Sequence, residues 1–172
     1  MKPTLWTRLD ALSRHLTPFG IAFFAVLLAV VPWRIPSLGV AGPIWPLMAV
    51  FYWTLYRPDL MPALAVFVIG LLFDALSGAP LGVNVLAFLT LHGLVAGQRR
   101  FFYGKPFMLI WLGFAVATAT ALAVAWVLTA LWYGSVIGGQ DRMVAQFVMT
   151  VGCFPLVSWA LFMWQRTFLK SV

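Results

Sequence analysis

The segment YRPDLMPALAVFVIGLLFDALSGAPLGVN, residues 56–84, decides how the rest of the chain is interpreted. It contains an apolar run of membrane length, from Met61 to Leu76, and this run carries one acid, Asp74. An ionised carboxylate near the centre of a bilayer costs roughly 2.5–3.5 kcal/mol on insertion scales. It therefore persists where it contacts water, pairs with another group or has a function. Asp74 is therefore the first residue that needs an explanation.

The composition identifies the broad class of protein. Hydrophobic residues make up 63% of the 172-residue chain, charged residues make up 9%, and the mean hydropathy is +0.99. Soluble domains average about 45–50% apolar and 25% charged residues. The length is sufficient for five or six helices of about 20 residues. We therefore predict an all-α, polytopic integral membrane protein with a single transmembrane domain over residues 1–172.

The distribution of charge and cysteine argues against other classes. The net charge of +7 is spread in ones and twos, without the basic helix or patch used to bind nucleic acid. Cys153 is the only cysteine, which excludes an intrachain disulfide and a thiolate metal site. The apolar runs offer too few further ligands to complete a metal site. We predict no metal and no cofactor.

The apolar runs and the prolines between them predict six spans. Their expected limits are about 18–31, 44–56, 60–76, 81–97, 106–133 and 143–164. The second run is short and aromatic, which indicates a thin or tilted entry at the membrane interface. Pro106 suits the first turn of the fifth helix. Pro155 lies inside the sixth run and predicts a kink there.

The positions of Lys and Arg predict the orientation, because these residues concentrate in cytoplasmic loops. With the N-terminus inside, six spans leave only Arg34 and Arg142 on the outer side. The other nine of the eleven basic residues then lie on the cytoplasmic side. Five spans would divide these groups or export the C-terminal pair, so we predict six spans with both termini cytoplasmic. The nine residues are Lys2, Arg8, Arg14, Arg57, Arg99, Arg100, Lys105, Arg166 and Lys170.

Gly70, Asp74 and Gly78 are four residues apart and share one ridge of the third predicted helix. Small residues at this spacing let another helix approach closely, which would bury the carboxylate or line a narrow polar notch. Asn84 is the nearest polar group in depth and is a candidate donor to Asp74. The direction of the helix places Asp74 in the outer half of the membrane. The alternative is that it lies at the outer rim, in contact with headgroup water, and has no role.

Two further features of the fourth predicted helix have alternative interpretations. His92 reaches Asp74 only if the third helix is tilted, and a lone histidine within a helix is more often a satisfied packing residue than a ligand. Gly93 and Gly97 form a small-xxx-small pattern. This pattern predicts close helix packing within the bundle or, less often, a dimer face.

Catalysis by Asp74 is disfavoured, because an aspartic intramembrane enzyme needs a second carboxylate within reach. The remaining acids lie at loops or helix ends, at Asp10, Asp59 and Asp141. We therefore predict that the protein is not an enzyme.

Three motifs together resemble the rod shape-determining MreD family. They are Tyr56-Arg57-Pro58, then Gly70-Leu71-Leu72-Phe73-Asp74, then Ala79-Pro80-Leu81-Gly82. The order and spacing of these motifs, the length and the six predicted spans agree with that family over essentially the whole chain. In this resemblance Arg57, Pro58, Pro80 and Gly82 are structural residues of the motifs.

The resemblance implies a non-enzymatic scaffold of the bacterial inner membrane. Members of that family belong to the elongasome, which builds side-wall peptidoglycan and sets rod cell shape. They bind the single-span protein MreC and, through it, connect MreB with RodA and its penicillin-binding protein partner. The family is also similar in fold to the substrate-binding subunits of vitamin uptake transporters, which have an outward pocket. By position, Asp74 would line that pocket, with Pro58, Gly70 and Gly82 as structural companions.

A second function remains open on the sequence, namely a substrate-binding transporter subunit for a small, vitamin-like molecule. Such a subunit needs a pocket with several convergent polar groups. The outer halves of the predicted spans offer Asp74, Asn84 and a few Ser and Thr residues.

Overall fold

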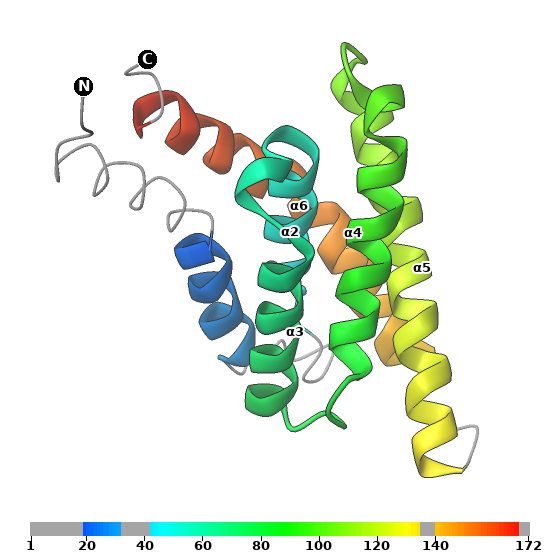
Figure 1. Cartoon of the computed structure of the whole chain (residues 1–172). Helices are drawn as coiled ribbons and strands as arrows, with labels where there is room; N and C mark the ends of the chain where they lie inside the picture. Colours follow the sequence, from blue (N-terminus) through cyan, green and yellow to red (C-terminus); the bar gives the residue numbers. More distant parts are fainter. Residues whose placement is uncertain (1–18, 32–41, 135–139, 169–172) are drawn as a thin grey trace, which may run out of the picture.

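The computed structural model of the chain describes residues 19–31, 42–134 and 140–168, and this part consists of helices and turns without a strand. The predicted all-α class is confirmed, and each helix lies within a few residues of an expected span. Figure 1 shows the helices packed against one another in alternating directions. They are Phe19–Val30, α2 (Trp45–Tyr56), the 3₁₀ turn η1 (Pro58–Leu60), α3 (Ala63–Ser77), α4 (Val83–Phe102), α5 (Phe107–Tyr133) and α6 (Gln140–Phe168). Most of the proline-rich segment before α2 lies outside the described residues.

Helix α2 is the centre of the bundle. Every residue from Pro46 to Leu55 is buried, as expected for a helix that is apolar on all sides. The helix is short, as predicted, and most of its aromatic side chains face the protein core; its tilt in the membrane stays a prediction. Its aromatic residues pack inside: the ring of Phe51 meets the rings of Phe114 on α5 and Phe154 on α6 edge-on, at centroid distances of 5.0 and 5.4 Å. Such edge-to-face contacts contribute beyond the area buried.

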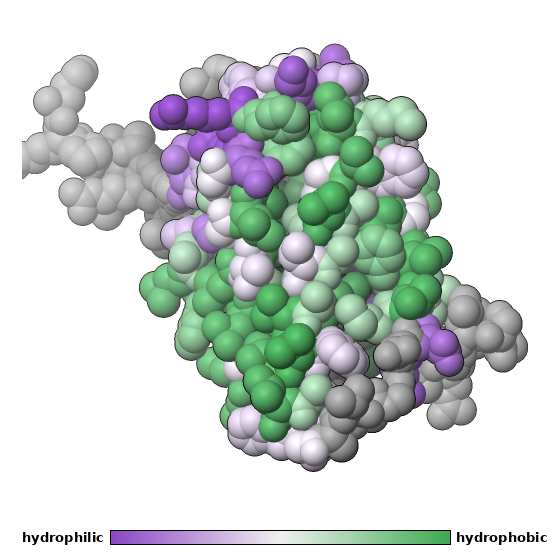
Figure 2. All heavy atoms as spheres, turned by 90° about the vertical axis from the view of Figure 1, so that its right-hand side faces the viewer, coloured by the Kyte–Doolittle hydropathy of each residue, from purple (hydrophilic) through white to green (hydrophobic). Residues whose placement is uncertain are grey.

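Helices α5 and α6 form a long apolar wall. Among the described residues, they are the two helices that are long and apolar enough to cross a membrane, while Phe19–Val30 and α3 are shorter apolar helices. Large apolar side chains point outwards from both, including Val116, Leu131, Leu156 and Trp159. Figure 2 shows hydrophobic residues over the middle of one face and hydrophilic residues gathered at the end where α4 turns into α5. This pattern is that of a membrane protein.

Pro155 lies inside α6, as predicted. Because proline has no N–H, the carbonyl of Val151 loses its usual partner four residues later. The indole Nε1 of Trp111 on α5 donates to that carbonyl at 2.9 Å. A polar group that the proline leaves free is thus paired by a neighbouring helix, as an apolar environment requires. This bond holds α5 against α6.

Helices α3 and α4 approach each other closely at Gly70. A Cβ atom built there would lie 2.7 Å from Cα of Val85 on α4. The obstacle is backbone, which has less freedom to move than the end of a side chain. The predicted close approach at Gly70 is confirmed.

The first prediction concerns Gly70. Gly70→Ala should destabilise the protein by about 1–3 kcal/mol, the usual cost of forcing a group into a packed contact. The midpoint of thermal unfolding in detergent measures the loss. Gly93→Ala is the matched control, because nothing lies within 4 Å of a Cβ at Gly93. Equal midpoints for the two variants would contradict the close approach.

The second prediction concerns the bond at the proline. Trp111→Phe should lower stability by about 1–2 kcal/mol, the range given for helix-to-helix hydrogen bonds in model membrane peptides. In a Pro155→Ala background, the new N–H pairs with Val151, so the same substitution should cost less. A double-mutant cycle of thermal unfolding gives this difference. A coupling of zero would show that Trp111 acts through packing alone.

Candidate functional site

The carboxylate of Asp74 is fully buried at the junction of α3 and α4. Its Oδ2 accepts hydrogen bonds from the backbone N–H of Gly82 at 2.8 Å and from that of Val85 at 3.4 Å. Its Oδ1 accepts from the backbone N–H of Asn84 at 3.0 Å and from the side-chain Nδ2 of Asn84 at 2.8 Å. The acid of one helix therefore binds the beginning of the next.

These bonds satisfy the unpaired backbone N–H groups at the start of α4. The first N–H groups of a helix have no partner within it and must be satisfied from outside. At the start of α4, the N-cap residue is Gly82, which has no side chain to provide a cap. Asp74 accepts two of the first N–H groups, and the N–H of Val83 pairs with the carbonyl of Pro80 at 3.2 Å. The negative charge also lies where the helix dipole favours it.

Two glycines shape the turn that brings the helix start to Asp74. Gly78 ends α3 with φ of 70° and ψ of 17°, the left-handed conformation that glycine adopts without strain. Gly82 begins α4 with φ of 100°. The hydroxyl of Ser77 donates to the carbonyl of Phe73 at 2.6 Å and closes the last turn of α3. Nothing lies within 4 Å of a Cβ at Gly78, so this residue ends the helix and does not pack against one, which corrects the prediction.

The structure brings Asp74 and Asn84 together, as the sequence indicated. The alternative prediction, that Asp74 lies at the membrane rim in contact with water, is wrong, because the exposed fraction of Asp74 is 0%. Both carboxylate oxygens are directed at α4 and its turn. The carboxylate therefore does not face an open notch.

The motif at Arg57-Pro58 forms the opposite turn, between α2 and α3. The backbone N–H of Arg57 closes α2 by donating to the carbonyl of Trp53 at 2.8 Å. Pro58 begins η1, and its carbonyl accepts from the N–H of Met61, a fully buried residue, at 3.1 Å. The arginine side chain itself is exposed.

His92 pairs with Thr54 on α2 and not with Asp74. The distance between Nδ1 of His92 and the hydroxyl oxygen of Thr54 is 2.9 Å. Thr54 is fully buried, so this bond satisfies a polar group in the core. The interpretation of His92 as a satisfied packing residue is confirmed.

Gly93 and Gly97 lie on an exposed face of α4, and nothing lies within 4 Å of a Cβ at either position. The prediction of close packing at these glycines within the bundle is therefore wrong for the described part of the chain. A helical repeat shows which residues share a face but not which face meets a neighbour. The dimer-face alternative stays a prediction.

Sequence reasoning missed a groove between α4 and α5. Its volume is about 290 Å³, and Gly113 and Ala117 of α5 are among its lining residues. The ring of Phe102 at the end of α4 occupies the space beside Gly113. The sequence signal for this groove was Gly113, a glycine within a long apolar helix. The groove is lined by Leu94, Val95, Gln98, Phe101, Phe102, Leu109, Leu112, Gly113, Val116 and Ala117.

Within the described ranges, no three His, Cys, Asp or Glu side chains lie close enough to hold a metal ion. Both oxygens of Asp74 accept hydrogen bonds, and their donors are backbone N–H groups and the amide of Asn84. The arrangement supports a helix junction and does not resemble an acid–base pair. These observations define an all-helical membrane protein with a structural acid.

Comparison with known proteins identifies its family. The family model described as rod shape-determining protein MreD matches residues 11–172. The chain belongs to this family, whose role lies in rod shape determination. No solved structure matches the chain. The expected likeness to vitamin transporter subunits therefore has no support from known structures.

The third prediction concerns the junction. Asp74→Asn should leave at least one buried N–H of α4 unpaired, because the amide has one acceptor oxygen where the carboxylate has two. Each such loss costs about 1–3 kcal/mol. Asn84→Ala removes one of the four bonds and should cost less. Thermal unfolding in detergent checks the order.

The matched control for this series is Asp59→Asn, because Asp59 is an exposed acid in η1. Its unfolding midpoint should equal that of the natural protein. If Asp74→Asn also unfolds at the natural midpoint, the carboxylate does not hold the junction together.

Proposed function

We propose that this protein is a non-enzymatic scaffold of the elongasome in the bacterial inner membrane. In this role it binds the transmembrane helix of MreC and helps to organise side-wall peptidoglycan synthesis, with MreB, RodA and its penicillin-binding protein partner connected indirectly. Membership of the family carries this proposal. The apolar outer surface supports it, because a scaffold in a bilayer has to present side chains to lipid and to partner helices.

The proposed topology has six membrane-crossing helices and both termini in the cytoplasm. Support comes from the charges at the two ends of the bundle. The turns at one end are flanked by four basic residues, Arg57, Arg99, Arg100 and Lys105. At the other end lies Arg142, next to Asp141. The positive-inside rule assigns the more basic end to the cytoplasm.

This topology places the Asp74 junction at the outer side of the membrane. The junction is a rigid turn, because three backbone N–H groups and one side-chain amide bind a single buried carboxylate. We propose that Asp74, Asn84, Gly70 and Gly78 shape a surface there for a partner protein. Under this proposal Asp74 acts by holding the turn in place, without contacting the partner.

The transporter alternative has no observation in its favour. It requires convergent polar groups that are free to bind a ligand, whereas the oxygens of Asp74 are engaged by α4. Retention of a vitamin through purification would reverse this preference.

The fourth prediction tests the scaffold. Depletion of the protein from rod-shaped cells should give spheres, and the tagged protein should copurify with MreC in mild detergent. Asp74→Asn should reduce copurification, while Asp59→Asn should not. Rods that remain rods after depletion, together with no copurification of MreC, would rule out the scaffold.

A further inference from the structure

We propose that the α4–α5 groove binds one acyl chain of an anionic phospholipid, with the headgroup held by Lys105. The site is separate from the Asp74 junction, because it lies where α4 ends and α5 begins. It goes beyond the scaffold function, and its cytoplasmic placement rests on the topology proposed above.

The walls of the groove are apolar along their length. Leu94 on α4 and Leu112 and Val116 on α5 line it, and the exposed fractions of Leu112 and Val116 are 60% and 59%. At Gly113 the ring of Phe102 takes the place of a side chain, and Ala117 adds only a methyl group to the wall. An acyl chain matches this lining, because it brings apolar surface and no polar group that needs a partner.

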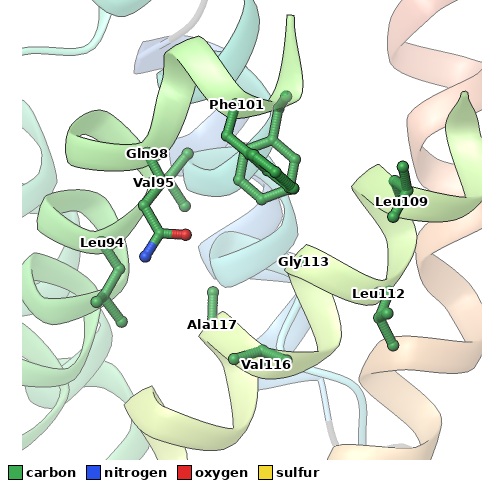
Figure 3. A pocket seen from close by; sticks show the side chains of 10 residues that line it. Leu94, Val95, Gln98, Phe101, Leu109, Leu112, Gly113, Val116 and Ala117 are labelled. Carbon is green, nitrogen blue, oxygen red and sulfur yellow. The ribbon is translucent and has the colours of Figure 1, made fainter. Parts of the chain in front are cut away.

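One end of the groove carries a positive charge. Figure 3 shows Phe101 at the end where α4 stops and the amide of Gln98 further down the groove, beside Leu94. The ammonium nitrogen of Lys105 lies 5.8 Å from the centroid of the Phe101 ring. This distance is within the range of a cation–π contact. An apolar slot with an ammonium beside one end matches the chemistry of an amphiphile.

A second hollow lies at the turn that follows Phe102, a residue that lines both spaces. Its volume is about 320 Å³. Its lining residues include Tyr56, Tyr103 and Lys105, which carry two hydroxyl groups and an ammonium. Hydroxyl and ammonium donors suit a phosphate group.

The charge around this end favours an anionic headgroup over a zwitterionic one. Arg57, Arg99, Arg100 and Lys105 lie near the two turns here, and Asp59 is the acid among the described residues at this end. Basic pockets between membrane helices on the cytoplasmic side are typical sites for acidic lipid headgroups. Each Lys or Arg near such a surface contributes about 1 kcal/mol.

The size of the groove argues against a partner helix as its occupant. A helix with side chains is about 10–12 Å thick, whereas the volume of this groove is about 290 Å³. A single acyl chain with a phosphate at its head fits this size.

The fifth prediction is a lipid titration. The full-length protein, purified and stripped of lipid in detergent, is titrated with phosphatidylglycerol and with phosphatidylcholine of the same acyl chains, and native mass spectrometry counts bound lipid. The natural protein should prefer phosphatidylglycerol. Lys105→Gln should weaken phosphatidylglycerol binding roughly fivefold, the equivalent of about 1 kcal/mol, and weaken phosphatidylcholine binding less, because the choline ammonium already balances that lipid's phosphate charge. Val116→Trp should fill the groove and weaken both.

Matched controls exist on the same chain. Arg142→Gln removes a cation from the opposite end, and Val127→Trp adds an indole to another exposed position of α5. Both should bind lipid as the natural protein does, and thermal unfolding confirms that all four variants are folded. Equal binding of the two lipids, or equal effects of each variant and its control, would overturn the proposal. Loss of MreC copurification in Val116→Trp with unchanged lipid binding would assign the groove to a partner helix instead.

Discussion

The pairing of the Asp74 carboxylate with the start of α4 is the interaction on which the α3–α4 half of the structure depends. In an apolar environment, a buried charge and a row of unpaired N–H groups are each costly. Here the two meet, and each removes the penalty of the other. Gly70 lets α4 approach, Gly78 and Gly82 turn the chain, and the acid then lies opposite the N–H groups of Asn84 and Val85.

The same constraint explains two further contacts between helices. Trp111 of α5 pairs the carbonyl that Pro155 leaves free in α6. Thr150 of α6 accepts the N–H of Ile44, just before α2, at 3.1 Å, and donates to the carbonyl of Gln146 at 2.6 Å. In all three cases a side chain from one helix satisfies the backbone of another. The bundle is therefore held by polar bonds at helix ends and breaks, with the aromatic cluster of Phe51, Phe114 and Phe154 between them.

The two ends of the bundle differ in chemistry, and this difference organises the functional proposals. One end carries a hydrogen-bonded acid within a rigid turn and suits contact with a protein outside the membrane. The other carries exposed cations beside an apolar groove and suits a lipid headgroup. A structural protein of the MreD family can combine both, because neither site needs a reacting group. The scaffold would then present a fixed surface on one side while lipid fills the groove between α4 and α5 on the other.

The sequence by itself determined the helices, the position of the acid and its pairing with Asn84, because hydrophobic runs, prolines and spacing along one chain are local properties. The tertiary structure decided the rest. Spacing did not reveal that backbone N–H groups bind Asp74, that Gly78 ends a helix, or that Gly93 and Gly97 face outwards. Nor did it reveal that α2 lies at the centre. These features depend on which helix faces meet, and that choice results from the packing of all the helices at once.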